Sequence, residues 1–423
     1  MEMNRSFWSY ANTRYVHVEL SNSCNAACPL CPRYVNRSLM VNPDLELGSI
    51  SIEKFKQWFP LDFVQRSSEW IFCGTNGDPM MAKDAYEIIE YVATNSKARI
   101  QINTNGSMRS PEFWKKLGLL FAEKIEEGGE EKIFKDPDWE QHSKNSIYRD
   151  IIDRRRYVVF SIDGLEDTNH IYRRNVNWQK LMANVRAYTS TGAYSIWDFL
   201  IFKHNEHQLE EAESFAYEIG ITNFTPKRPF GFDHFDSNYY MDMNVYDAGG
   251  KYLYKIEPAS SMEWRLNKAT NKFKTGTDPI PLPPKKKDPD SSKIKWKERI
   301  ESETKRNKFP EKFKGSSVSC KSCHPHGKEI YVDCNGNVFP CCFVGTMVNG
   351  DFNYWDPIQL RKRLYEYGTE NISLKNNSLR DILNGGYLDS VFANRWENAA
   401  EEERTTYCFS TCSVNHMKDL FVN

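Results

Sequence analysis

Three cysteines lie close together near the start of the chain, in the run Cys24-Asn-Ala-Ala-Cys28-Pro-Leu-Cys31. Their C-x3-C-x2-C spacing places three thiolates on one short loop, directly after a strand-like apolar run. Three thiolates can ligate three irons of a cubic 4Fe–4S cluster and leave the fourth iron without a protein ligand. A metal with an open position is a site for chemistry, as it is in catalytic zinc sites. The alternative is a zinc loop that takes its fourth ligand from elsewhere in the chain.

The composition is that of a globular protein. The chain has 423 residues, of which 40% are hydrophobic and 27% charged, and its formal net charge is −1. This length suits two domains, or one large barrel with an appendage. The near-zero charge offers no field for nucleic acid or membranes, no apolar run is long enough to span a membrane, and the first residues lack a signal-peptide pattern. We therefore expect a cytoplasmic protein, a setting in which cysteines are used for metal ligation rather than for disulfides.

Short β-rich runs alternate with amphipathic stretches over the first half of the chain. The expected strands cover residues 15–20, 70–73, 100–103, 157–162, 196–202 and 221–225. Helical periodicity is found between them, for example at residues 52–59, 85–94, 178–188 and 207–219. Six alternating β–α units predict a parallel sheet with helices outside, either a partial barrel or a doubly wound sheet.

Polar residues and glycines cluster directly after several of these strands. In parallel α/β barrels, the loops at the carboxyl ends of the strands carry the chemistry. The cysteine loop follows the first strand, so we expect it to face the same mouth as the other loops. These loops are Gly74-Thr-Asn-Gly-Asp-Pro79, Asn103-Thr-Asn-Gly106 and Ser161-Ile-Asp-Gly164.

The rest of the chain differs in composition. An acidic stretch at residues 123–140 is expected to be a solvated insertion, and residues 265–314, rich in Lys and Pro, are typical of a linker or surface arm. A second set of cysteines follows, with a short strand at residues 328–332 and a hairpin turn at Asn335-Gly-Asn337. We divide the chain into a barrel at 1–235, a linker or basic arm at 236–318 and a cysteine-rich unit at 319–423.

In this order, the motifs resemble those of radical S-adenosylmethionine (SAM) enzymes with a C-terminal auxiliary-cluster domain of the SPASM/twitch type. The resemblance implies an α/β fold, a partial (β/α)6 TIM barrel with a small α+β iron–sulfur domain. It implies that Cys24, Cys28 and Cys31 ligate a 4Fe–4S cluster whose open iron binds SAM. An electron from this cluster, delivered by a donor such as flavodoxin or ferredoxin, would cleave SAM to a 5′-deoxyadenosyl radical that abstracts hydrogen from a substrate carbon.

The resemblance also implies SAM-binding residues. Asn76-Gly77-Asp78-Pro79 aligns with a Gly-Gly-Glu-Pro motif that binds the SAM amino group, although Asn and Asp replace the first Gly and the Glu. Ser161 and Asp163, at the end of the fourth strand, are expected at the ribose hydroxyls, and Asn105 at the adenine or carboxylate. The alternatives are a simple turn for the first motif and a helix cap or Asx-turn for Asp163. No acid–base catalyst is assigned beyond the cluster.

The late cysteines resemble the twitch pattern, which carries one auxiliary 4Fe–4S cluster. Its expected ligands are Cys341, Cys408 and Cys412, with Cys323 as the fourth and Cys320 as the other possibility. The alternative is a zinc ion held by Cys320, Cys323, Cys408 and Cys412.

The resemblance implies a radical SAM oxidoreductase or maturase that oxidises, cross-links or epimerises a ribosomally made peptide. The alternative is a dehydrogenase or epimerase acting on a sugar, aminocyclitol or other small metabolite. A third class, a nucleic-acid-binding module using zinc and the basic arm, is disfavoured by the near-zero charge and by the lack of regular aromatic–basic interleaving.

Overall fold

The structure is a computed structural model of the 423-residue chain. It describes residues 7–34, 38–43, 45–122, 156–229, 240–241, 243–261, 264, 273–274, 323–324, 327–349, 364, 367–395 and 408. The acidic stretch at 123–140, most of the basic stretch at 265–314, Cys320 and Cys412 lie outside the described residues, and of Cys323 only the backbone is described.

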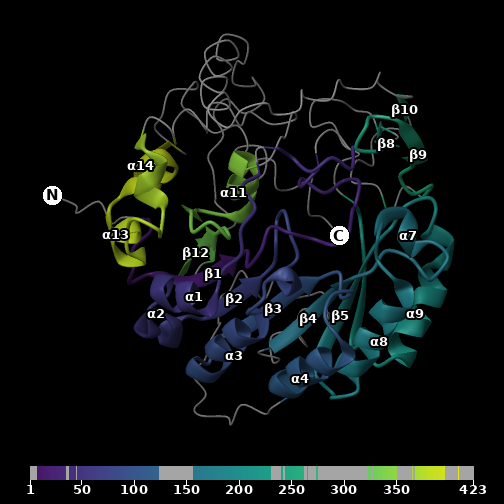
Figure 1. The fold of residues 1–423 in the computed structure, drawn as a ribbon, viewed down its shortest axis with the longest axis horizontal. Helices are drawn as coiled ribbons and strands as arrows, with labels where there is room; N and C mark the ends of the chain where they lie inside the picture. The colour runs from purple at the N-terminus through teal and green to yellow at the C-terminus, as the bar shows by residue number, and fades with distance from the viewer. Residues whose placement is uncertain are drawn as a thin grey trace.

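A mostly parallel sheet forms the centre of the molecule (Figure 1). Its first six strands are parallel neighbours in chain order, which confirms the alternation predicted from the sequence. Each lies within two residues of its expected position. They are β1 (Thr13–Val18), β2 (Glu69–Phe72), β3 (Arg99–Thr104), β4 (Arg156–Ser161), β5 (Tyr194–Leu200) and β6 (Asn223–Lys227).

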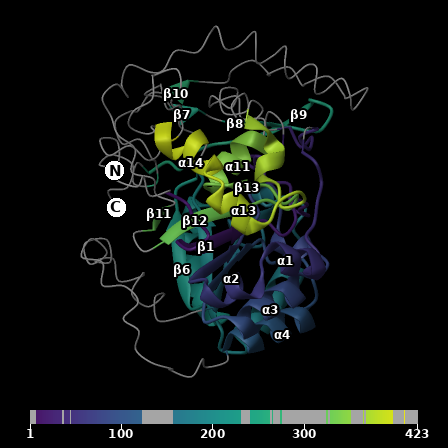
Figure 2. The same cartoon turned by 90° about the vertical axis from the view of Figure 1, so that its left-hand side faces the viewer.

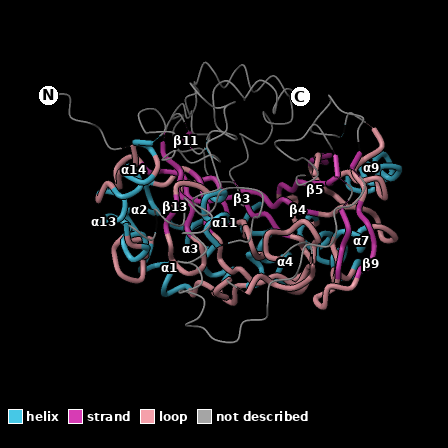
Figure 3. The backbone as a smooth tube through the Cα atoms, turned by 90° about the horizontal axis from the view of Figure 1, so that it is seen from above, coloured by secondary structure: helices cyan, strands magenta, loops and turns pink. Residues whose placement is uncertain are grey.

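Helices connect these strands and lie along one side of the sheet (Figures 1 and 3). Local capping sets where some of them begin: Ser51 accepts a hydrogen bond from the Lys54 amide at 3.3 Å, and Asn177 from the Lys180 amide at 2.8 Å. The helices are α1 (Ile52–Trp58), α2 (Leu61–Arg66), α3 (Ala85–Asn95), α4 (Pro111–Ala122), α7 (Asn169–Tyr172), α8 (Trp178–Thr189) and α9 (Leu209–Glu218).

The late part of the chain returns to the same sheet. Strand β12 (Gly327–Val332) pairs in parallel with β1, and the Glu19 amide donates to the Val332 carbonyl at 2.9 Å. β11 (Cys323–His324) and β13 (Val338–Phe339) both pair antiparallel with β12, giving a nine-stranded sheet whose main path runs β11-β12-β1-β2-β3-β4-β5-β6. Among the described strands, β11 and β6 are the two ends of this path and do not pair with each other. The described sheet is therefore open, and the partial barrel expected from the sequence stays a prediction.

The predicted hairpin turn between β12 and β13 is confirmed. Gly336 has a φ of +85°, and the Asp333 carboxylate accepts hydrogen bonds from the Asn335 and Asn337 amides at 2.9 Å. A Cβ at Gly336 would also lie 2.8 Å from the Trp58 ring. Only glycine fits both the left-handed backbone and this close contact.

The remaining elements lie outside this sheet. β8 (Met243–Tyr246) and β9 (Tyr252–Ile256) form an antiparallel hairpin with buried Met243, Val245 and Ile256. Part of the segment expected to be a linker is therefore packed sheet, although the division into domains stays a prediction. The elements α11 (Cys342–Asn349), α13 (Leu379–Asn384) and α14 (Tyr387–Val391) lie beside β12 (Figures 1 and 2). An ion pair joins α13 to α2, with Arg380 Nη2 3.4 Å from Asp62 Oδ2.

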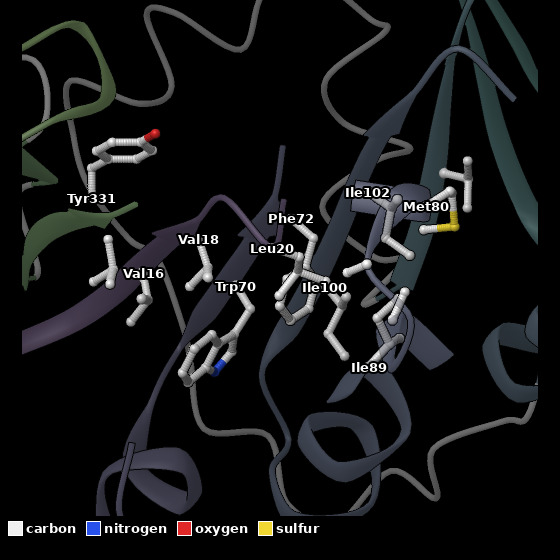
Figure 4. Packing of buried hydrophobic residues seen from close by; sticks show 14 of the residues in the cluster. Val16, Val18, Leu20, Trp70, Phe72, Met80, Ile89, Ile100, Ile102 and Tyr331 are labelled. Carbon is white, nitrogen blue, oxygen red and sulfur yellow. The ribbon is translucent and has the colours of Figure 1, made fainter. Parts of the chain in front are cut away.

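One large hydrophobic core joins the sheet to its helices. Figure 4 shows Val16, Val18 and Leu20 beside Trp70 and Phe72, each at most 1% exposed. The same cluster includes Tyr331 of β12, so the late strand shares its core with the early ones. Among the described residues, no helix has the length and apolar character needed to cross a membrane.

Candidate functional site

The loop with the three early cysteines begins directly after β1, at the carboxyl edge of the sheet. It folds into short turns: the Cys31 amide donates to the Cys28 carbonyl at 3.0 Å, and the Tyr34 amide to the Cys31 carbonyl at 3.1 Å. Cys28 is buried, whereas Cys24 and Cys31 are half-buried. One neighbouring segment anchors the loop from outside, because the Ala27 amide donates to the Arg174 carbonyl at 2.9 Å.

Two side chains from other loops direct N–H groups at the sulfurs. Arg173 Nη1 lies 3.5 Å from Cys28 Sγ, and Asn105 Nδ2 lies 3.6 Å from Cys24 Sγ. Both contacts connect residues far apart in the sequence, so they follow from the fold. N–H donors of this kind stabilise negative charge on sulfur and tune iron–sulfur centres.

The three thiols also influence one another electrostatically. Burial raises the pKa of all three, to about 12 for Cys31, and the pKa of Cys24 is raised further by Asp78 and by the other two sulfurs. Arg173 opposes this effect at Cys28. The thiols are therefore close enough to interact, and protonated at neutral pH when no metal is bound. A metal that replaces the protons removes the cost of burying thiolate charge.

Arg173 is held in place by Asp163. The Asp163 carboxylate accepts from Arg173 Nε at 2.5 Å and from the Leu200 amide at 2.7 Å, and the side chain is fully buried. Because both oxygens are engaged, Asp163 positions the arginine that faces Cys28. The sequence did not point to Arg173; the only signal was the Arg173-Arg174 pair following Asp163 in the same β–α unit.

Asp78 is engaged in the same way within the loop after β2. Its carboxylate accepts from the Met80 amide at 2.9 Å, the Asn105 amide at 2.8 Å and Thr104 Oγ1 at 2.9 and 3.0 Å. These bonds tie the loop after β2 to the end of β3. Pro79 follows as the first residue of a short 3-10 turn, Pro79–Met81.

The first half of this motif packs against the cysteine loop. A Cβ on Gly77 would lie 2.1 Å from the Ser21 carbonyl oxygen, so this close approach of two backbones requires glycine. The buried Arg33 guanidinium donates to the Asn22 carbonyl and lies 3.4 Å from the Asn76 carbonyl. The predicted motif therefore borders the cysteine loop, while the SAM contacts assigned to it stay a prediction.

The other predicted SAM contacts occupy the same edge. Asn105 bridges Cys24 to Asn25, with Nδ2 3.0 Å from Asn25 Oδ1, and its Oδ1 accepts from the Ser107 amide at 3.0 Å. Ser161 is the half-buried last residue of β4, opposite Asp198 of β5. The fold brings Asn76–Pro79, Asn105 and Asp163 around the cysteine loop, whereas Ser161 has no contact that assigns it a role.

The late cysteines are only partly described. Cys341 and Cys408 are half-buried, and both pack against the main core. Within the described part of the chain, no three His, Cys, Asp or Glu side chains lie close enough together to hold a single metal ion. The ligand set of Cys323, Cys341, Cys408 and Cys412, with Cys320 as the other possibility, stays a prediction.

A buried polar network joins the site to β12. Glu19, which follows β1, accepts from the Asn76 amide at 2.7 Å and from Tyr331 Oη at 3.0 Å, and Tyr331 also lies 2.9 Å from Thr75 Oγ1. Burial raises the pKa of Glu19 from its ordinary value of 4.5 to about 7, and the nearby Asp333 adds to the rise. Glu19 is thus a positioning residue that sequence reasoning left unassigned.

The raised pKa of Glu19 makes stability depend on pH. The fold favours the protonated form, so its contribution is full below about pH 4.5 and is lost as the pH rises through about 7. Between pH 5 and pH 8 the unfolding free energy of the wild-type protein should fall by a few kcal/mol. Glu19→Gln stays neutral over this range, so its unfolding free energy should not show this fall. Urea unfolding at both pH values measures this, with the exposed Glu87→Gln as control. An unchanged pH dependence in Glu19→Gln would contradict the assignment.

Known proteins resemble this chain only loosely. No protein-family model matches the sequence, and no curated protein matches it. Streptococcus suis SuiB bound to S-adenosylmethionine is a similar solved structure, with 13% identity and a TM-score of 0.41 over 82% of this chain and 68% of that one. Native anSMEcpe with bound AdoMet and Cp18Cys peptide is another similar solved structure, with 10% identity and a TM-score of 0.39. The alignment covers 96% of this chain and 82% of that one.

Proposed function

We propose that this chain is a radical SAM enzyme. The observation that carries the proposal is the C-x3-C-x2-C loop itself, which lies at the carboxyl edge of a mostly parallel sheet beside the loops after β2, β3 and β4. In α/β folds this edge is where ligands bind. Cys24, Cys28 and Cys31 would hold a 4Fe–4S cluster there, which would supply the electron for reductive cleavage of SAM and so give the enzyme a radical for hydrogen abstraction from the substrate.

The residues present fit such a cluster. Cys24, Cys28 and Cys31 would hold it, because the three thiols lie on one short loop and are close enough to interact electrostatically. Ligands of one zinc ion must all lie within about 2.3 Å of it, whereas cluster ligands bind different irons. Arg173 and Asn105 would donate to two of the sulfurs.

We assign the SAM contact of the loop after β2 to its backbone. Both oxygens of Asp78 already accept hydrogen bonds from the protein, so the carboxylate orients the turn. The backbone of Asn76 and Gly77, which borders the cysteine loop, then offers carbonyl oxygens to the SAM amino group. In this proposal Asp163 acts through Arg173.

The finer parts of the proposal concern the late cysteines and the substrate. We propose one auxiliary cluster held by Cys341, Cys408, Cys412 and Cys323, or Cys320 in place of Cys323. The proposed reaction is oxidation, cross-linking or epimerisation of a ribosomally made peptide, with a small metabolite as the alternative substrate.

Anaerobic purification and reconstitution with iron and sulfide test the proposal. We expect a brown protein with roughly eight irons, four for each of two clusters, that forms 5′-deoxyadenosine from SAM when reduced. About four irons with SAM cleavage would keep the radical SAM assignment and remove the auxiliary cluster. A colourless protein that binds zinc and leaves SAM intact would overturn the function.

A further inference from the structure

A pocket of about 690 Å³ opens beside the cysteine loop, on the side of α7. Three separate segments form its wall: the end of α7 with the residues after it, the loop after β5, and the end of β9. Figure 1 shows α7 and β9 at the same end of the molecule, and Tyr254 Oη donates to the Ile171 carbonyl at 2.7 Å to join them. The polar side chains of the wall are His170, Arg174, Lys203, His204, Tyr254, Lys255 and Glu257.

The wall carries more positive than negative charge. Lys203 and Lys255 share the Glu257 carboxylate, each with its Nζ 3.2 Å from one of the two oxygens. Among the lining residues, Arg174, Lys203 and Lys255 are cationic and Glu257 is anionic. Glu257 also demonstrates that these lysines can hold a carboxylate between them.

Two buried nitrogen atoms in the wall residues have no hydrogen-bond partner among the described residues: Arg174 Nη1 and His204 Nε2. Burial lowers the pKa of His204 to about 4, with His170 and His207 adding to the effect, so its ring is neutral at pH 7. Unpartnered buried polar groups are costly, so such positions are where a ligand gains affinity by supplying the missing bonds. A carboxylate has two oxygens to accept them, and guanidinium groups match its planar geometry.

The position of the pocket ties it to the proposed site. Arg174 lines the pocket and its carbonyl binds the cysteine loop at Ala27, while the adjacent Arg173 faces Cys28. We propose that this pocket binds a carboxylate group of the substrate and thereby anchors an acidic substrate next to the cysteine loop. The carboxylate belongs to an acidic residue or the C-terminus of a peptide, or to a small organic acid. The role as a substrate anchor rests on the proposed function; carboxylate binding does not.

Binding is tested on the full-length, anaerobically reconstituted protein by isothermal titration. The probes are acetyl-Gly-Glu-Gly-Glu-Gly-amide, its Gln counterpart, glutarate and inorganic phosphate. We expect the acidic peptide or glutarate to bind, more tightly at low ionic strength, and the Gln peptide to bind at least about tenfold more weakly, because it lacks charge-assisted hydrogen bonds. A preference for the peptide identifies a peptide as the source of the carboxylate, and a preference for glutarate identifies a small acid.

Variants locate the binding. Arg174→Gln and Lys203→Gln should each weaken binding of the preferred carboxylate roughly tenfold, whereas Lys251→Gln, an exposed residue in the β8–β9 turn that does not line the pocket, should not. SAM cleavage without added substrate and urea unfolding report separately on the cluster and the fold. Equal binding of acidic and Gln peptides, phosphate as the sole ligand, or unaltered affinity in both pocket variants would overturn the inference. If the wild-type protein binds the carboxylate but does not cleave SAM, the result would instead count against the proposed function.

Discussion

Cys28→Ala is expected to remove the early cluster and stop SAM cleavage. Cys28 is the buried member of the trio, and Arg173 donates to its sulfur. In the proposed cluster, alanine would leave one iron without its thiolate ligand, and the Arg173 guanidinium would lose its contact with the sulfur. Loss of outer-sphere partners alone lowers metal affinity 10- to 100-fold, so loss of the ligand should lower 5′-deoxyadenosine formation by roughly 100-fold or more.

Iron and sulfide content and 5′-deoxyadenosine formation measure this effect after anaerobic reconstitution. Cys73→Ala is the matched control, because Cys73 is a half-buried thiol outside the loop whose sulfur lies 3.6 Å from the Gly74 carbonyl. The Cys73→Ala variant should keep both its iron content and its SAM cleavage activity. If Cys28→Ala cleaves SAM as the control does, the early loop is not the cluster site.

Asp78→Ala is expected to destabilise the fold even in cluster-free protein. The substitution leaves the Met80 and Asn105 amides and the Thr104 hydroxyl without their shared acceptor in a buried region. Each unsatisfied buried donor costs about 1–3 kcal/mol, and water entering the gap offsets part of this, so we expect a loss of about 3–5 kcal/mol in unfolding free energy. Asp78→Asn keeps one accepting oxygen, so its unfolding free energy should lie between those of the wild type and Asp78→Ala.

Urea unfolding of the iron-free protein separates this role from cofactor binding. Glu87→Ala on the exposed face of α3 serves as control and should change stability by no more than about 0.5 kcal/mol. If Asp78→Ala unfolds like the wild type and yet binds SAM more weakly, the carboxylate faces the cofactor and the backbone assignment is wrong.

The early strands could be predicted because their signal is local. Tyr157, Val158, Val159 and Phe160 form a continuous buried run, as expected of a central parallel strand. The same local pattern identified the strand at residues 328–332. It could not reveal that this strand pairs with β1, because both faces of either strand are buried and nothing in a buried run names its partner.

The site was predictable to a similar extent. Spacing predicted the cysteine loop, and the resemblance to radical SAM enzymes, together with their place directly after predicted strands, predicted Asn76–Pro79 and Asp163. The internal bonds of Asp78 and Asp163 could not be predicted, since a buried carboxylate bonded to the protein and one bonded to a ligand look alike in sequence. Arg173 was missed because its contact with Cys28 spans 145 positions and exists only in the fold.

Because β12 pairs with β1, one edge of β1 stays unpaired during translation until β12 has been synthesised. Glu19 and Tyr331, which meet across this junction, are 312 positions apart. At translation rates of about 5–20 residues per second, β1 waits about 15–60 s for its neighbour to be made. During that interval the outer edge of β1 has unpaired backbone groups that can recruit a strand from another nascent chain. Slower decoding between the two segments would lengthen this exposure and lower the yield of soluble protein.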